Sequence, residues 1–351
     1  MTAALWPALQ EELVVPASSA YRPAQALGEA GAGALDASFR FLHDRVQQAS
    51  YERILPEQRT AAHLEIGRRL RGRYRSEGGT PPHLLTLVRH LNLGSARMES
   101  EEERRDLARL NLEAARAAKA ASAHRLMADL LDAAQALLGG GAWQEEPGLG
   151  VEIALERLLA DHLLRAFDDV EARALGLLAR PLPAPARLQV QELRVRCCMA
   201  TGEFARGREL GLAVLAERGE AYPQTEEACL AAYLEEAAEL DRWYERTPDA
   251  FDQMPPSTLP EQAALDALVM HTAFCAGIGG RPMLASLSFV RAMSELRRRG
   301  TLVPTSPYLI AALAEASSAI TGAYREAARW IRARRAQRRA DGVPDAGRVP
   351  G

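Results

Sequence analysis

His43 and Asp44 are the adjacent side chains in this sequence best suited to chemistry. In helical metal hydrolases such a pair binds a divalent cation, because imidazole and carboxylate groups are both common metal ligands. That chemistry also needs a second His upstream and an Asp on a later helix, and no His precedes His43. The sequence therefore favours a structural role, in which a buried His43 at a helix N-terminus is hydrogen-bonded to a neighbour.

The other candidates for metal or thiol chemistry are weaker. His83 and His90 lie seven residues apart on one expected helix, which separates them by about 10.5 Å along its axis, too far for one metal ion. The cysteines have neither zinc nor redox spacing, and we expect them to fill the core of a reduced protein. They are Cys197, Cys198, Cys229 and Cys275.

Nucleotide and acyl-transfer chemistry lack their usual motifs. Lys119 is the only lysine, and no glycine-rich loop precedes it. Gly139–Gly141 is not followed by the Gly-Lys-Ser/Thr of a phosphate-binding loop, so we interpret it as a linker. No Gly-x-Ser-x-Gly run occurs. We therefore expect no catalytic residue, no cofactor, no metal and no small-molecule substrate, and we predict that the chain is not an enzyme.

The composition predicts an all-α fold. Hydrophobic residues make up 48% of the 351 residues but aromatic residues only 5%, which favours helices packed through Ala and Leu over a β-sheet. The formal net charge of −3 gives no electrostatic reason to expect nucleic acid or a membrane as partner. The N-terminus has no signal-peptide pattern, and no window reaches 18 uninterrupted apolar residues. We expect a cytoplasmic protein.

The run 41–49, which reads FLHDRVQQA, carries the most specific signal in the chain. It resembles the run at the end of the ATPase region in very large bacterial signalling proteins. Those proteins join a serine/threonine kinase domain, an AAA-like ATPase of the STAND type, a long helical repeat region, a GAF sensor and often a histidine kinase. The residues that carry the resemblance are Phe41, His43, Asp44, Arg45, Gln47, Gln48, His63, Gly67, Leu91, Asn92 and Asn111.

The resemblance implies that residues 1–55 are a partial winged-helix remnant, the subdomain that follows the nucleotide-binding core in the family. We expect a helix over residues 4–13 and strands at Val14–Pro16 and Phe39–Phe41, like a recognition helix and wing. The nucleotide-binding core would lie upstream of Met1, so we expect the chain to be a fragment that lacks the P-loop. Residues 1–15 contain no Arg or Lys, which disfavours DNA binding.

Residues 56–330 are predicted to form a TPR-like α-helical repeat region. We expect two helices between residues 56 and 93, broken at 76–82 by Gly and Pro, with Pro81 opening the second helix. Gly94 fits a helix C-cap. Residues 100–138 are helical by every local criterion. Residues 331–351 form an Arg-rich tail that we expect to be disordered.

A degenerate repeat in residues 151–330 predicts a TPR-like α-solenoid of antiparallel helix pairs. It is visible in residues 165–170, 202–207 and 322–327. In each copy a left-handed Gly would turn the chain and an aromatic residue would wedge between helices, although Arg165 replaces the Gly in the first. The wedge residues are Phe167, Phe204 and Tyr324. The first helix of each pair would line a concave groove.

The sequence therefore predicts a non-catalytic, protein-interaction and regulatory module of the bacterial AAA/STAND ATPase signalling family. Its expected partners are proteins, with an ATPase or kinase module as the candidate implied by the resemblance. One alternative is a chain that supplies the sensor region of a multi-chain ATPase/kinase signalling enzyme. Another is a DNA-binding transcriptional regulator that uses the winged-helix remnant.

Overall fold

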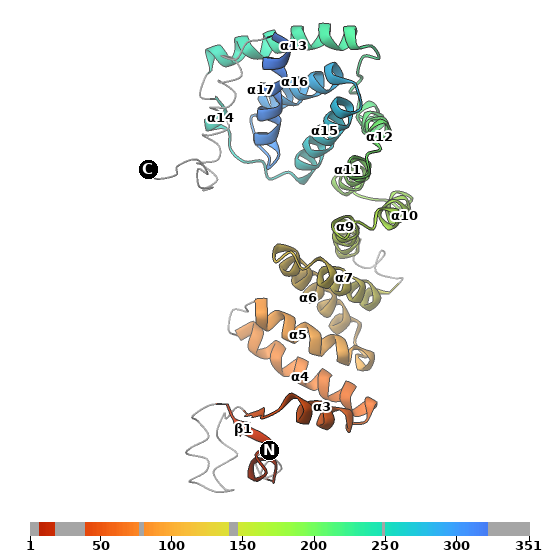
Figure 1. Cartoon of the computed structure of the whole chain (residues 1–351), viewed down its shortest axis with the longest axis vertical. Coiled ribbons are helices and arrows are strands. Elements are labelled where there is room, and N and C mark those ends of the chain that lie inside the picture. The colour runs from red at the N-terminus through yellow and green to blue at the C-terminus, as the bar shows by residue number, and fades with distance from the viewer. Residues whose placement is uncertain (1–6, 18–38, 77–80, 140–146, 248–249, 322–351) are drawn as a thin grey trace. The chain divides into compact units, whose positions relative to one another are not determined.

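The computed structural model describes residues 7–17, 39–76, 81–139, 147–247 and 250–321. Helices account for 79% of these residues, so the predicted all-α class is confirmed. The chain divides into two compact units, Met1–Ala114 (unit 1) and Ala115–Gly351 (unit 2), whose elements are shown in Figure 1. Within the described residues no helix has both the length and the apolar character needed to cross a membrane.

Unit 1 begins with the two predicted strands. Strand β1 (Val14–Pro16) pairs antiparallel with β2 (Phe39–Phe41), and Val14 lies opposite Phe41. The helix expected over residues 4–13 is helical only at 7–10 within the described residues, and the chain then turns at Glu12, whose φ is 54°. Helix α3 (Asp44–Glu52) follows β2 and has no buried residue. Residues 1–6 and 18–38 of the expected winged-helix segment lie outside the described residues.

Helices α4 (Pro56–Ser76) and α5 (Pro81–Gly94) pack on each other and confirm the predicted break between them. Helix α5 ends at Gly94, where the C-terminal end of the helix was predicted, but this glycine is not left-handed: its φ is −93° and it leads into the short 3-10 helix η1 (Ser95–Arg97). Gly94 instead allows close approach: a Cβ there would lie 2.6 Å from the backbone nitrogen of Leu64 on α4.

The helix expected over residues 100–138 is two helices, α6 (Glu101–Ala120) and α7 (His124–Leu138). Ser122 has a left-handed φ of 58°, and the backbone N–H of Ala123 donates to the Ala118 carbonyl at 2.8 Å. The single-helix prediction was wrong because this turn uses neither Gly nor Pro, the residues that usually mark a break.

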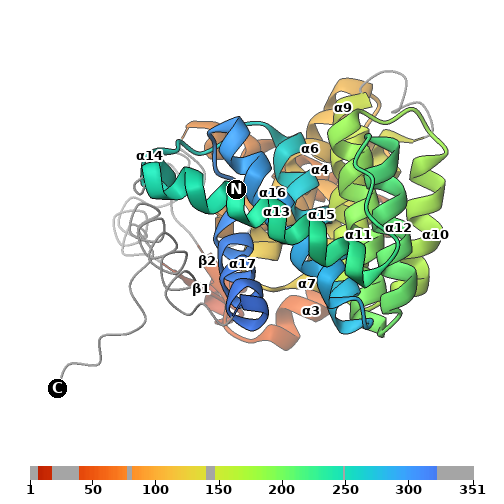
Figure 2. The same cartoon turned by 90° about the horizontal axis from the view of Figure 1, so that it is seen from above.

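Unit 2 continues with a series of packed helices. Helix α9 packs on α7, α10 and α11, while α15 packs on α11, α12 and α16. Helices α11 and α12 lie side by side in both views (Figure 1, Figure 2). The helices are α9 (Pro147–Leu163), α10 (Phe167–Leu178), α11 (Ala184–Thr201), α12 (Phe204–Glu217), α13 (Glu226–Arg246), α14 (Ala250–Gln253), α15 (Pro260–Ile278), α16 (Pro282–Arg299) and α17 (Ser306–Thr321).

The same turn joins four helix pairs, namely α6/α7, α9/α10, α11/α12 and α15/α16. In each, a residue with left-handed φ is followed by a residue whose N–H donates to the carbonyl five positions earlier. The left-handed residues are Ser122, Arg165, Gly202 and Gly280, with φ of 58°, 62°, 80° and 83°. Arg165 therefore adopts the turn expected of a Gly, which confirms the predicted turn position in the first copy of the motif.

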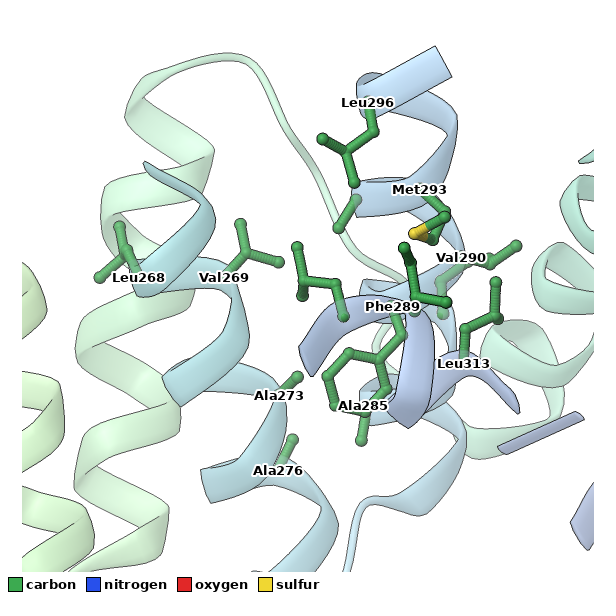
Figure 3. Packing of buried hydrophobic residues seen from close by; sticks show 14 of the residues in the cluster. Leu268, Val269, Ala273, Ala276, Ala285, Phe289, Val290, Met293, Leu296 and Leu313 are labelled. Atoms are coloured by element: carbon green, nitrogen blue, oxygen red, sulfur yellow. The ribbon is translucent and has the colours of Figure 1, made fainter. Parts of the chain in front are cut away.

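The largest core of unit 2 extends from α11 to α17, and most of its residues lie on α15, α16 and α17, part of which Figure 3 shows. Figure 3 shows Val269, Ala273 and Ala276 on the side of α15 that faces α16, whose Ala285, Phe289 and Met293 lie opposite, whereas Leu268 lies on the other side of α15. Small alanines allow these helices to approach closely. This explains how a chain poor in aromatic residues still buries a continuous apolar core.

Candidate functional site

The motif residues predicted from the sequence separate into an exposed set and a packed set. The exposed set lies on β2 and the first turns of α3 and comprises Phe41, His43, Asp44, Arg45, Gln47 and Gln48. Asp44 occupies the first turn of α3, as expected. The buried, hydrogen-bonded His43 is wrong: His43 is the N-cap residue of α3, but it is exposed and makes no capping hydrogen bond. No residue of α3 is buried, so the N-terminus of this helix does not pack against a hydrophobic core.

The packed set lies between α4, α5 and α6 of unit 1. A Cβ at Gly67 would lie 2.5 Å from Cδ2 of Leu91, so this glycine makes room for the leucine. The side chains of Asn92 and Asn111 exchange two hydrogen bonds, and Asn111, which is fully buried, also donates to the Leu107 carbonyl at 3.0 Å. These residues therefore fix how three helices pack.

His63 belongs to the packed set and joins three helices. Its Nδ1 lies 2.8 Å from Nδ1 of His90 on α5, and its Nε2 lies 3.0 Å from the hydroxyl of Tyr51 on α3. Burial and the charge of Arg89 lower the pKa of His63, while burial, His63 and Arg89 lower that of His90. The pairing of His90 with His83, considered from the sequence, does not occur, because His83 is exposed. The partner of His90 is His63, and only the alignment of α4 against α5 could have indicated this contact.

A groove in unit 2, which we call the first-helix groove, is lined by α6, α9 and α11, the first helices of three pairs. Its hollow has a volume of about 480 Å³. Leu155, Leu159 and Leu193 supply apolar lining. Gln189 lines the groove and is exposed. The groove therefore combines an apolar surface with polar groups that a ligand can reach.

Ion pairs hold the α6 side of the first-helix groove. Nη2 of Arg116 lies 2.7 Å from Oε2 of Glu152, and its Nε lies 3.3 Å from Oε1 of Glu156. Nζ of Lys119, the only lysine, lies 2.7 Å from Oε2 of Glu156. Hydrogen bonding to the two glutamates raises the pKa of Arg116 although burial opposes it. Lys119 therefore bridges two helices and contributes to packing.

Two half-buried histidines, His271 and His162, lie close to Glu192 and Arg196 of the groove lining. Nδ1 of His271 on α15 lies 2.9 Å from Oε1 of Glu192, and Nδ1 of His162 lies 3.2 Å from Sγ of Cys197. Burial and the charge of Arg196 lower the pKa of His162 to about 4, and burial raises that of Cys197 to about 12. Both groups are thus neutral near pH 7, and the pair lacks the thiolate that nucleophilic catalysis requires.

The cysteines of the described chain are all buried and unpaired as disulfides. Among the described residues, no three His, Cys, Asp or Glu side chains are grouped so that they could hold a metal ion.

The predicted wedge residues Phe167 and Phe204 occupy equivalent places, as the first residues of α10 and α12. Both are half-buried and pack against apolar clusters of unit 2. A Cβ at Gly279 would lie 3.3 Å from Cβ of Phe204, so α12 approaches the end of α15 at this point. The third wedge, Tyr324, and the tail 331–351 lie outside the described residues.

No protein-family model, curated protein or solved structure matches the chain. The resemblance of the run 41–49 to the signalling ATPases therefore stays a hypothesis.

Proposed function

We propose that the chain is a non-catalytic, TPR-like helical-repeat module that binds a protein partner in a signalling system of the AAA/STAND ATPase type. The partner would be an ATPase or kinase module, and the complex would be cytoplasmic. The first-helix groove is the proposed binding surface.

The observation that carries this proposal is a recurring offset of 35 to 39 residues between bonded side chains on alternate helices. Arg68 pairs with Glu103 in unit 1, Arg116 with Glu152 and Glu171 with Arg206 in unit 2, and their separations along the chain are 35, 36 and 35 residues. Other pairs repeat it: Tyr74–Glu113 with 39, Lys119–Glu156 with 37 and His162–Cys197 with 35.

A repeated offset of this kind supports a solenoid register in each unit. TPR arrays have a period of about 34 residues, and each repeat contacts mainly its neighbours. In such an array, equivalent positions of consecutive repeats lie side by side. A side chain can therefore bond to a side chain about one repeat length further along the chain. Glu171 and Arg206 link α10 to α12, the second helices of two pairs, while the other unit 2 pairs link first helices.

The composition of the first-helix groove fits a protein ligand better than a small molecule. Its hollow is open, and apolar leucines lie beside charged and amide side chains. Protein interfaces commonly combine an apolar centre with a polar rim. Gln189 on α11 lines the groove and is exposed, so its side chain would contact a bound partner.

Site-specific photo-crosslinking in the cells that make the protein tests this proposal. A photo-crosslinking amino acid at Gln189 should form an adduct with an ATPase or kinase subunit, identified by mass spectrometry. The matched control is Glu209 on α12, a second helix, whose side chain is 73% exposed. Adducts that form equally at both positions, or at neither, would contradict the proposal that the first-helix groove is the binding surface. A specific adduct with an unrelated protein would support the module and refute the family assignment.

A further inference from the structure

His63 of unit 1 is held through both of its ring nitrogens. The Nδ1 atoms of His63 and His90 are 2.8 Å apart, and the Tyr51 hydroxyl is 3.0 Å from Nε2 of His63. The ring centroid of His63 lies 5.0 Å from that of His90 and 5.8 Å from that of Tyr51. The three side chains therefore form one hydrogen-bonded chain across α3, α4 and α5.

Proton counting limits the states of this chain. A nitrogen–nitrogen contact of 2.8 Å needs one hydrogen between the two atoms, so one Nδ1 donates and the other accepts. A first added proton is compatible with the contact, since a charged His63 can still donate to a neutral His90. A second added proton is not, because both Nδ1 atoms would then carry hydrogens that point at each other.

The surroundings oppose the second proton. Burial lowers the pKa values of both imidazoles below the usual 6.5, the charge of His63 lowers that of His90 further, and the charge of Arg89 on α5 acts on both in the same direction. Arg59 of α4 lies 4.8 Å from the centre of the Tyr51 ring and donates to the carbonyls of Glu52 and Ile54. Within the described residues, no carboxylate is hydrogen-bonded to either imidazole to offset these charges.

We propose that His63 and His90 form an acid-sensitive latch that fastens α3 and α5 to α4 and opens when both imidazoles are protonated. Helix α3 buries no residue. Its side-chain links to α4 in the described structure are the Tyr51–His63 bond and the contacts of Arg59. The second proton leaves the Nε2–H of His63 able to donate to Tyr51, so α3 is released because repulsion between the two Nδ1–H groups displaces the whole His63 ring. Opening the latch thereby loosens the helix that carries the exposed motif residues Asp44, Arg45, Gln47 and Gln48.

The direction of the pH effect follows from proton linkage. The closed state binds the second proton more weakly than free histidines with a pKa of 6.5, so the latch is fully favoured above that pH. As the pH falls below 6.5 the open state takes up the extra proton and gains population. With one linked proton, the ratio of open to closed forms rises about tenfold per pH unit until the closed state also titrates.

Hydrogen exchange of the full chain at about pH 7.5 and pH 5, corrected for intrinsic rates, tests the latch. In the wild type, amides of α3 and of the α5 segment near His90 should lose protection at the lower pH. His90→Gln should abolish this pH dependence, because a glutamine cannot take up a proton. His83→Gln, on the same helix but exposed, should keep it.

Tyr51→Phe separates the two halves of the latch. It removes the bond to α3 and leaves the histidine pair, so α3 should be poorly protected at both pH values while α5 keeps its pH dependence. Unchanged wild-type protection at about pH 5, or an undiminished response in His90→Gln, would overturn the proposal. Parallel loss of protection in α15 and α16 would also overturn it, by showing global unfolding.

Discussion

Asn92 and Asn111 form a reciprocal amide pair: Nδ2 of Asn92 donates to Oδ1 of Asn111 at 2.8 Å, and Nδ2 of Asn111 donates back to Oδ1 of Asn92 at 2.9 Å. The pair joins α5 to α6 inside unit 1, where Asn111 is fully buried. Each amide satisfies the other, so neither can be removed alone without leaving unpaired polar atoms.

Asn111→Ala should lower the free energy of unfolding by about 1–3 kcal/mol, because it leaves the amide of Asn92 without its partner in a partly buried site. Urea-induced unfolding followed by circular dichroism measures this change. Glu102→Gln, at an exposed position near the start of the same helix, should stay within about 0.5 kcal/mol of the wild type. A silent Asn111→Ala would show that the amide pair does not determine the α5–α6 packing.

Gly94→Ala should be destabilising by about 1–3 kcal/mol, because the new methyl group would press against the α4 backbone at Leu64. Gly72→Ala provides a matched control within α4 itself. A Cβ at Gly72 meets no atom within 4 Å, so this change should raise stability by about 0.5–1 kcal/mol through helix propensity. Thermal unfolding of both variants checks the opposite signs. The same sign for both would contradict the close approach.

Ser122→Gly should stabilise the protein by about 1 kcal/mol, because glycine relieves the strain of a left-handed φ. Ala121→Gly, one residue earlier in the α6–α7 turn, should give no such gain, because that position has no positive φ. Chemical denaturation distinguishes the two. A loss of stability in Ser122→Gly would instead favour a continuous helix through residues 120–124.

Phe204→Ala should cost about 1.5–3 kcal/mol, roughly half the loss for a fully buried phenylalanine, because the ring is half-buried against α15. Tyr308 is 60% exposed, so Tyr308→Ala should lower the free energy of unfolding by less than about 0.5 kcal/mol. Calorimetric unfolding compares the two aromatic residues directly. Equal, small effects would refute the wedge role proposed for Phe204.

Local sequence signals predicted the helical class and several boundaries correctly. The low aromatic content indicated helices, Gly and Pro marked the break between α4 and α5, and short β-branched and aromatic runs marked β1 and β2. Gly202 was recognised as a left-handed turn residue because glycine has no Cβ penalty there. These features depend on a few neighbouring residues, which is the information a single sequence carries.

Features that depend on tertiary register could not be predicted. Ser122 has the same turn as Gly202 without its sequence signal. His63 and His90 lie 27 residues apart, and their contact depends on how α4 and α5 are aligned. His43 was expected to be buried at a helix N-terminus, but whether a helix start packs against a core is decided by distant elements. The packing role of Asn92 and Asn111 likewise became visible only when α5 and α6 were placed together.

The affinity of the crosslinked partner for groove variants tests the central claim most directly. Isothermal titration calorimetry with the purified partner should give a Kd for Gln189→Arg at least about tenfold weaker than wild type, a loss of about 1.4 kcal/mol, with unchanged circular dichroism. Glu209→Arg, on the second-helix face, should bind like the wild type. If Gln189→Arg bound with wild-type affinity, or both variants lost affinity equally, the first-helix groove would not be the binding surface.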